Sequence, residues 1–178
     1  VAVFEDLSLE IEQGSFVAVL GGNGCGKSTL ANLLIRLYDV TAGEILIDGI
    51  NVKDYSLKNL RDGVGMVLQK NVLFSGTIKE NLRWGNEHAT DEEIVAACQA
   101  AAADDFIRSF PEQYDMDLGQ GGVNVSGGQK QRLCIARALL KRPKIIIFDD
   151  ATSAVDTATD ARIREALRSH MPDTTKLI

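Results

Sequence analysis

The chain has 178 residues, of which 45% are hydrophobic and 25% charged, a size and composition typical of one folded domain. Its 19 Lys and Arg residues against 25 Asp and Glu residues give a net charge of −6, which argues against nucleic acid as a partner. No apolar run approaches the roughly 20 residues that cross a bilayer, and the three cysteines lack metal-ligand spacing. We therefore expect a soluble chain in a reducing cytosol, with any membrane role supplied by a partner.

The first part of the chain alternates predicted strands with one helix. Residues 7–12 alternate apolar and polar side chains, as a half-exposed strand does, whereas residues 16–20 are uniformly apolar and predict a buried strand. Leucines at helical spacing predict a helix over residues 28–37. Two further strands are predicted. The first, at residues 43–49, has turn residues at both ends, and the second lies at residues 64–68.

The second part is mainly helical. Residues 77–110 predict helices, and residues 90–93 have the spacing of a capping box, in which two side chains satisfy backbone N–H groups at a helix start. Residues 126–142 repeat this spacing and predict another helix. A buried strand at residues 144–148 and a last helix at residues 159–169 follow. The order of elements predicts an α/β fold.

A glycine-rich phosphate-binding motif follows the strand predicted at residues 16–20. The sequence GGNGCGKST fits G-x-x-x-x-G-K-[ST], and it lies between a strand and a helix, the context that the motif requires. Its glycines let backbone N–H groups converge on phosphate oxygens, while Lys27 adds positive charge at the β and γ phosphates and Ser28 ligates Mg²⁺. The alternative is a glycine-rich turn with an exposed lysine, which both flanking elements disfavour. The predicted nucleotide-binding residues are Gly22, Asn23, Gly24, Cys25, Gly26, Lys27, Ser28 and Thr29.

Two carboxylates end the strand predicted at residues 144–148. Ligands bind at the carboxyl ends of strands in α/β sheets, so Asp149 and Asp150 are placed for catalysis. We expect Asp149 to hold Mg²⁺ through water and Asp150 to orient or deprotonate the attacking water. Alone the pair could be a solvated strand end, but the phosphate loop upstream favours a functional site.

The sequence VSGGQKQR at residues 125–132 resembles the signature LSGGQxQR of ABC ATPases. A helix that begins here leaves backbone N–H groups free for an anion, so the predicted ligands are Ser126, Gly127, Gly128 and Gln129. The resemblance implies that this site closes on the γ-phosphate of ATP held by an opposite subunit. Hydrolysis would then require a dimer of two nucleotide-binding domains, identical or different.

Further motifs resemble the same family over essentially the whole chain. Gln69 stands where the family glutamine reaches Mg²⁺ and the attacking water and senses the transmembrane domains, and residues 153–156 resemble the D-loop. Residues 73–82 resemble the LFxGTIxENL motif of exporters. Residues 119–122 resemble the exporter X-loop, with Gln120 at a position where glutamate is common.

The resemblance implies a P-loop NTPase core, that is, a mainly parallel sheet flanked by helices, with an antiparallel β insert and an α-helical signature subdomain at about residues 75–140. It implies a single domain over residues 1–178, trimmed at both ends from a longer polypeptide with transmembrane helices. We therefore expect ATP and Mg²⁺ as cofactors, and a multidrug or lipid exporter at the cytoplasmic face of the plasma (cell inner) membrane.

This sequence departs from the family pattern at several positions. Asp150 replaces the usual glutamate and is one methylene shorter, so hydrolysis could be slow, as in the degenerate half of a heterodimeric exporter. Val125 replaces leucine, and Phe4 is interpreted as a strand residue because the family's adenine-stacking aromatic and switch histidine fall outside the chain. An ATP-gated regulatory half-site remains the alternative to an active ATPase; a soluble ABC protein of DNA repair or translation is disfavoured.

Four other residues carry weaker signals. Cys25 is either a reactive thiol inside the phosphate loop or a small filler residue, and Trp84 either packs in the helical subdomain or contacts a partner. His88 and His170 are expected to be exposed and without a role.

Overall fold

The fold is organised around a parallel sheet. A computed structural model describes residues 3–149 and 155–178. The sheet has the strand order β1-β6-β5-β4, and each of its pairs is parallel. Its strands are β1 (Phe16–Val17), β6 (Thr175–Leu177), β5 (Ile145–Phe148) and β4 (Val64–Val67). The α/β prediction is confirmed, and the sheet brings the ends of β4 and β5 side by side.

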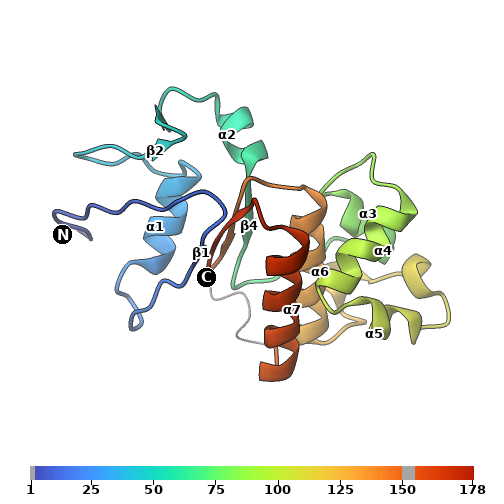
Figure 1. Ribbon diagram of the computed structural model, residues 1–178. Coiled ribbons are helices and arrows are strands. Elements are labelled where there is room, and N and C mark those ends of the chain that lie inside the picture. The colour runs from blue at the N-terminus through green and yellow to red at the C-terminus, as the bar shows by residue number, and fades with distance from the viewer. Residues whose placement is uncertain (1–2, 150–154) are drawn as a thin grey trace.

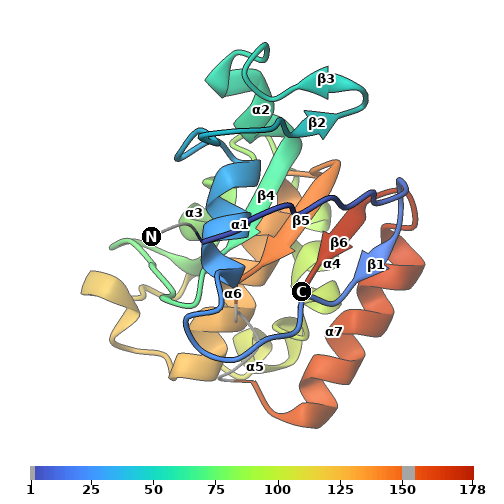
Figure 2. The same ribbon diagram turned by 90° about the vertical axis from the view of Figure 1, so that its left-hand side faces the viewer.

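Helices cover both faces of the sheet. Helix α1 (Lys27–Leu34) lies on one face, and α6 (Gly127–Leu140) and α7 (Thr157–His170) lie on the other (Figures 1 and 2). Successive side chains of a strand point to opposite faces, so Ile147 packs with α1 while Ile146 joins the larger core on the α6 side. The apolar run of β5 is therefore buried on both sides.

A small insert lies between α1 and β4. Strands β2 (Leu46–Ile47) and β3 (Ile50–Asn51) form an antiparallel hairpin, whose turn residues Asp48 and Gly49 have φ angles of 53° and 75°. Helix α2 (Leu57–Gly63) follows and leads directly into β4. The predicted antiparallel β insert is confirmed.

A group of short helices precedes α6 and packs against it. Its helices are α3 (Ile78–Arg83), α4 (Asp91–Ala100) and α5 (Asp104–Arg108), followed by the 3₁₀ turns η1 (Gln113–Asp115) and η2 (Gln120–Gly122). The predicted capping boxes are confirmed: Thr90 with Glu93 begins α4, and Ser126 with Gln129 begins α6. Helices α3 and α4 bury their apolar faces against α6, in the larger core.

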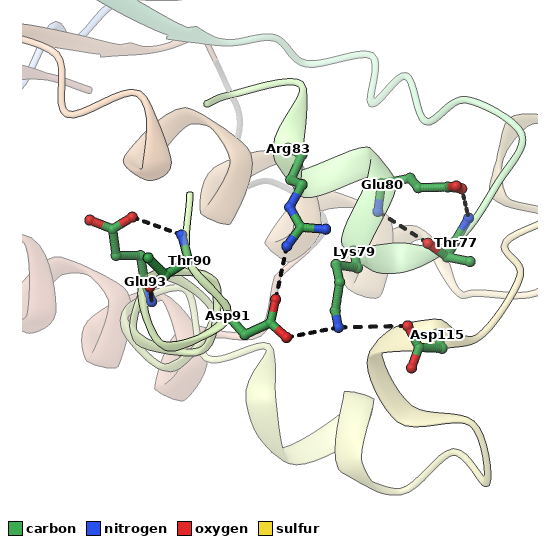
Figure 3. Close-up of polar contacts among 8 residues, drawn as sticks. All are labelled: Thr77, Lys79, Glu80, Arg83, Thr90, Asp91, Glu93 and Asp115. Atoms are coloured by element: carbon green, nitrogen blue, oxygen red, sulfur yellow. Dashed lines mark hydrogen bonds and ion pairs between the residues drawn. The ribbon is translucent and has the colours of Figure 1, made fainter. Parts of the chain in front are cut away.

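Ion pairs join the helices of this group at their surface (Figure 3). Asp91, at the start of α4, accepts from Lys79 at 3.1 Å and from Arg83 at 2.9 Å, and Lys79 also lies 3.7 Å from Asp115. The hydrogen bond from Lys79 is the main cause that lowers the pKa of Asp91. Such exposed pairs contribute little stability, so they orient α3 and α4 while apolar packing holds them.

Some predicted elements differ from the structure. Residues 7–12 form no strand, and Leu9 is 62% exposed, because within the described residues no neighbouring strand pairs with them. Strand β1 ends at Val17, before the predicted end at residue 20, and Leu20 is 89% exposed. Helix α2 and strand β6 were not predicted.

Candidate functional site

The glycine-rich loop joins β1 to α1 at the carboxyl edge of the sheet. Gly26 precedes the first residue of α1 and has a φ of 103°, and a Cβ there would lie 2.8 Å from Phe4. No side chain caps this helix start. The N–H groups of the first turn are therefore available to an anion, as a phosphate-binding loop requires.

Lys27 folds back over the loop. Its Nζ donates to the carbonyl oxygens of Gly21 at 2.7 Å and Gly22 at 3.2 Å. Gly22 and the three residues after it are exposed. The one ammonium group of the loop thus lies beside exposed backbone, where it can meet phosphate oxygens.

The sheet brings Asp149 to this loop. Ser28, the second residue of α1, donates from Oγ to Oδ1 of Asp149 at 2.8 Å, although 121 residues separate them. A hydroxyl beside a carboxylate is a donor set that Mg²⁺ accepts, with phosphate oxygens and water completing an octahedron. The residues present therefore fit Mg²⁺ bound together with a nucleotide.

Gln69 follows the strand next to that of Asp149. Val67 pairs with Phe148 in the sheet, and the backbone N–H of Asp149 donates to Val67 O at 3.0 Å. Gln69, two residues after Val67, is exposed at the same edge. Asp150 lies outside the described residues, as do Ser153 and Ala154 of the motif at residues 153–156.

The motif at residues 125–132 begins α6, as predicted. Ser126 Oγ accepts from the N–H of Gln129 at 3.3 Å, and Gln129 Oε1 accepts from the N–H of Ser126 at 2.8 Å. Ser126 and Gly127 are exposed, and a Cβ on Gly127 would meet no atom within 4 Å. Among the described residues no hydrogen bond joins residues 126–129, the second predicted anion site, to the phosphate loop.

A groove of about 280 Å³ that the motifs did not predict lies next to Gln69. We call it the β4–α6 groove, because residues 65–72, apart from Gln69, line one side of it, and Cys134, Arg137 and Ala138 of α6 and Lys141 just after this helix line the other. It runs between the residues that follow β4 and one side of α6. Trp84 is 68% exposed and stacks on Phe74 with ring centroids 4.6 Å apart. Both readings of Trp84 thus have support, since it packs on Phe74 and also presents a free face. The signal in the sequence was an aromatic pair ten residues apart, which only tertiary packing joins.

Two other predictions concern exposed side chains. Cys25 is a free thiol on the exposed loop, and its Sγ lies where a Cβ on Gly21 would approach within 2.4 Å. The thiol therefore covers the Gly21 backbone, as a filler residue does, and it is also exposed, as a reactive thiol must be. His88 and His170 are exposed, as predicted.

In the described parts of the chain no helix combines the length and the apolar character of a membrane span. The sequence profile of the ABC transporter family matches residues 4–153.

Known proteins match almost the whole chain. A multidrug export ATP-binding/permease protein of Staphylococcus aureus strain NCTC 8325 is 52% identical over 176 residues, which are 99% of this chain and 30% of that protein. Its counterpart in the bovine strain RF122 / ET3-1 is 51% identical over the same shares. The structure of a bacterial Atm1-family ABC exporter with ATP bound superposes with a TM-score of 0.93 at 43% identity, covering 98% of this chain and 31% of that one. The chain thus spans about 30% of the length of these relatives.

Proposed function

The chain belongs to the ABC transporter family as an ATP-binding domain, and from that premise we propose that it hydrolyses ATP to power export of a substrate through transmembrane segments. The contact between Ser28 and Asp149 carries the proposal, because it brings a hydroxyl and a carboxylate, a donor pair that suits Mg²⁺, to the glycine-rich loop. The names of the relatives, which combine ATP-binding and permease functions, support a transmembrane partner in the same polypeptide. The site would then work at the cytoplasmic face of the membrane.

The roles of the residues follow from their places in the fold. Lys27 and the N–H groups around Gly26 bind the phosphates, and Ser28 and Asp149 hold Mg²⁺, which supplies charge neutralisation at the phosphates when bound. Gln69 and Asp150 position the attacking water and accept its proton, by their places in the sequence. The nucleotide-binding set further includes Gly22, Asn23, Gly24, Cys25 and Thr29.

The second anion site supports a dimeric arrangement. Ser126 and Gly127 are exposed and make no hydrogen bond to the phosphate loop among the described residues, so they are free to face a nucleotide held by another domain. We infer that Gly128 and Gln129 belong to the same surface, with residues 75–140 as the subdomain that presents it. The two composite sites of such a dimer would be identical in a homodimer and different in a heterodimer.

Asp150 favours a second candidate function, that of an ATP-gated half-site with little hydrolysis in a heterodimeric exporter. Its carboxylate is one methylene shorter than that of glutamate, and under this second candidate it would act as a weaker general base. Phosphate release by the full transporter with its partner separates the two functions. Steady release that is lost when this domain carries Asp150→Asn supports hydrolysis at this site, whereas release that Asp150→Asn keeps and Lys27→Ala loses supports a gating role.

A further inference from the structure

Arg132 ends the motif at residues 125–132 and lies one helical turn after Gly128 on α6. It is half-buried, and its Nη1 donates to the carbonyl oxygen of Ala102 at 2.8 Å, although 30 residues separate the two. Its guanidinium also lies over the ring of Phe106, 4.7 Å from the centroid. A planar guanidinium can make both contacts at once, because stacking uses its face and donation uses its edge. Arg132 therefore holds α6 to the segment that joins α4 to α5.

That segment is a tight corner at residues 101–103, which we call the α4–α5 corner and whose three alanines are buried. Ala102 has a φ of 53°, a left-handed conformation that a residue with a Cβ rarely adopts. The N–H of Ala103 donates to the carbonyl oxygen of Cys98 at 2.7 Å, which keeps the corner in this form. The corner thus presents the Ala102 carbonyl to Arg132 in a fixed direction.

Helix α7 reaches the same place. Arg162 on α7 pairs with Asp105 on α5 at 3.6 Å, and Asp156, the last residue of the motif at residues 153–156, caps the start of α7. Burial lowers the pKa of Arg132, and the negative charges of Asp156 and Asp105 act against this effect. Arg132 therefore lies at the junction of α5, α6 and α7, within the electrostatic field of both neighbouring helices.

The first turn of α6 has few contacts of its own. Ser126 and Gly127 are exposed, and a Cβ on Gly127 would meet no atom within 4 Å. Two glycines in succession keep more backbone freedom than any other pair, so this turn unwinds easily unless the next turn is held. Arg132 holds that next turn at the α4–α5 corner, and its Nε also approaches the carbonyl oxygen of Gly128 at 3.4 Å. The direction of the first turn thus depends on Arg132.

We infer that Arg132 is a positioning residue for the anion site at Ser126 and Gly127, which it orients by anchoring α6 to the α4–α5 corner without touching the nucleotide. The inference rests on the proposed function, because it takes this site to face a nucleotide held by another domain. A displacement of about 1 Å can cost about a hundredfold in rate, so a residue that only orients the site matters. The effect is local: the phosphate loop of this domain binds its own nucleotide without help from Arg132.

The test measures amide hydrogen exchange by mass spectrometry in the full-length transporter that contains this domain. Exchange is compared with and without Mg²⁺ and the non-hydrolysable nucleotide adenylyl imidodiphosphate. In the unchanged transporter the nucleotide should slow exchange both in residues 21–29 and in residues 126–129. In Arg132→Met the slowing should persist in residues 21–29, whereas in residues 126–129 it should fall by at least about tenfold. A role of Arg132 in stability alone would not separate the two segments.

Two further variants complete the test. Arg132→Lys keeps the positive charge but loses the planar fork, so it should separate the two segments in the same way even where Arg132→Met does not fold. Arg168→Met is the matched control, because Arg168 also lies over an aromatic ring, that of Phe16 at 4.8 Å, but on α7. The nucleotide should slow exchange in both segments of this control as it does in the unchanged transporter.

Slow exchange retained in residues 126–129 of an Arg132 variant that folds, or an equal loss of slowing in both segments, would overturn the inference. If the nucleotide did not slow exchange in residues 126–129 of the unchanged transporter, the inference would fail together with the dimeric arrangement on which it rests. The exchange measurement needs no hydrolysis. A transporter that shows the expected separation but releases no phosphate therefore counts against the proposed ATPase activity alone.

Discussion

The hydroxyl of Ser28 lies 2.8 Å from Oδ1 of Asp149, and this contact joins the start of α1 to the end of β5. Each residue is held by its backbone: Ser28 by the first turn of the helix and Asp149 by the hydrogen bond from its N–H to Val67 O. The backbone therefore fixes both side chains at the place where we propose that Mg²⁺ binds.

Asp149→Asn should weaken ATP binding only when Mg²⁺ is present. Removing the charge leaves an amide oxygen, a poorer ligand for a hard cation, so the affinity for Mg-ATP should fall by about tenfold, or about 1.4 kcal/mol. Titration calorimetry with and without EDTA measures the difference. Asp62→Asn, an exposed acid on α2, is the control, and an equal loss in EDTA would argue against a cation role for Asp149.

Asp150→Glu should raise turnover at this site. A carboxylate that reaches the water acts as a positioned base, which contributes about 10² to 10⁴ in rate. The phosphate-release rate of the full transporter, with the partner site inactivated, measures the change. If the rate does not rise, the signature motif of the facing domain limits turnover, and Asp150 does not.

Gly85→Ala should destabilise the helical group around α3. A Cβ at this position would lie 2.1 Å from the carbonyl oxygen of Arg137, so the end of α3 would have to move away from α6. We expect a loss of about 1 to 3 kcal/mol in the free energy of unfolding, measured by urea denaturation. Gly63→Ala, where a Cβ meets nothing within 4 Å, should leave it unchanged or raise it by up to about 1 kcal/mol.

Asp104→Asn should destabilise the protein near neutral pH but not in acid. Burial of Asp104 raises its pKa, but the hydrogen bonds from Tyr114 at 2.6 Å and from Arg108 at 2.9 Å outweigh this and hold it below the ordinary value. A lowered pKa stabilises the fold above the ordinary pKa, and this contribution is lost as the pH falls through the folded value.

The loss at pH 7 should therefore be about 1.5 to 3 kcal/mol, the range for hydrogen bonds to a charged group. It should shrink as the pH falls below the ordinary pKa of Asp, near 4. Urea denaturation at a series of pH values, with Asp62→Asn as the exposed control, measures it. If the free energy of unfolding of Asp104→Asn stayed below that of the unchanged protein by the same amount at every pH, the effect would come from packing alone.

Local signals explain what the sequence predicted well. The capping boxes at Thr90 and Ser126 and the loop before α1 depend on residues three to eight positions apart, so the local sequence encodes them. Residues 7–12 had the alternation of a strand, but a strand also needs a neighbour to pair with. Strand β6 was missed because Thr175 and Lys176 are polar, although both are buried between β1 and β5.

The β4–α6 groove shows the other limit of sequence analysis. Phe74, Trp84 and Arg137 are separated by up to 63 positions, and only the packing of α3 on α6 brings them to one wall. The sequence predicted that Ser28 and Asp149 both serve Mg²⁺, but it did not predict that the two side chains contact each other.

Mg-ATP affinity of Lys27→Ala tests the central claim most directly, because Lys27 is the one ammonium among the glycines of residues 21–29. Calorimetry on the full transporter should give micromolar binding for the unchanged protein and a loss of at least about a hundredfold, or about 2.7 kcal/mol, for the variant. Lys58→Ala, exposed on α2, should bind as the unchanged protein does. Micromolar affinity retained by Lys27→Ala would contradict the assignment of this loop as the nucleotide site.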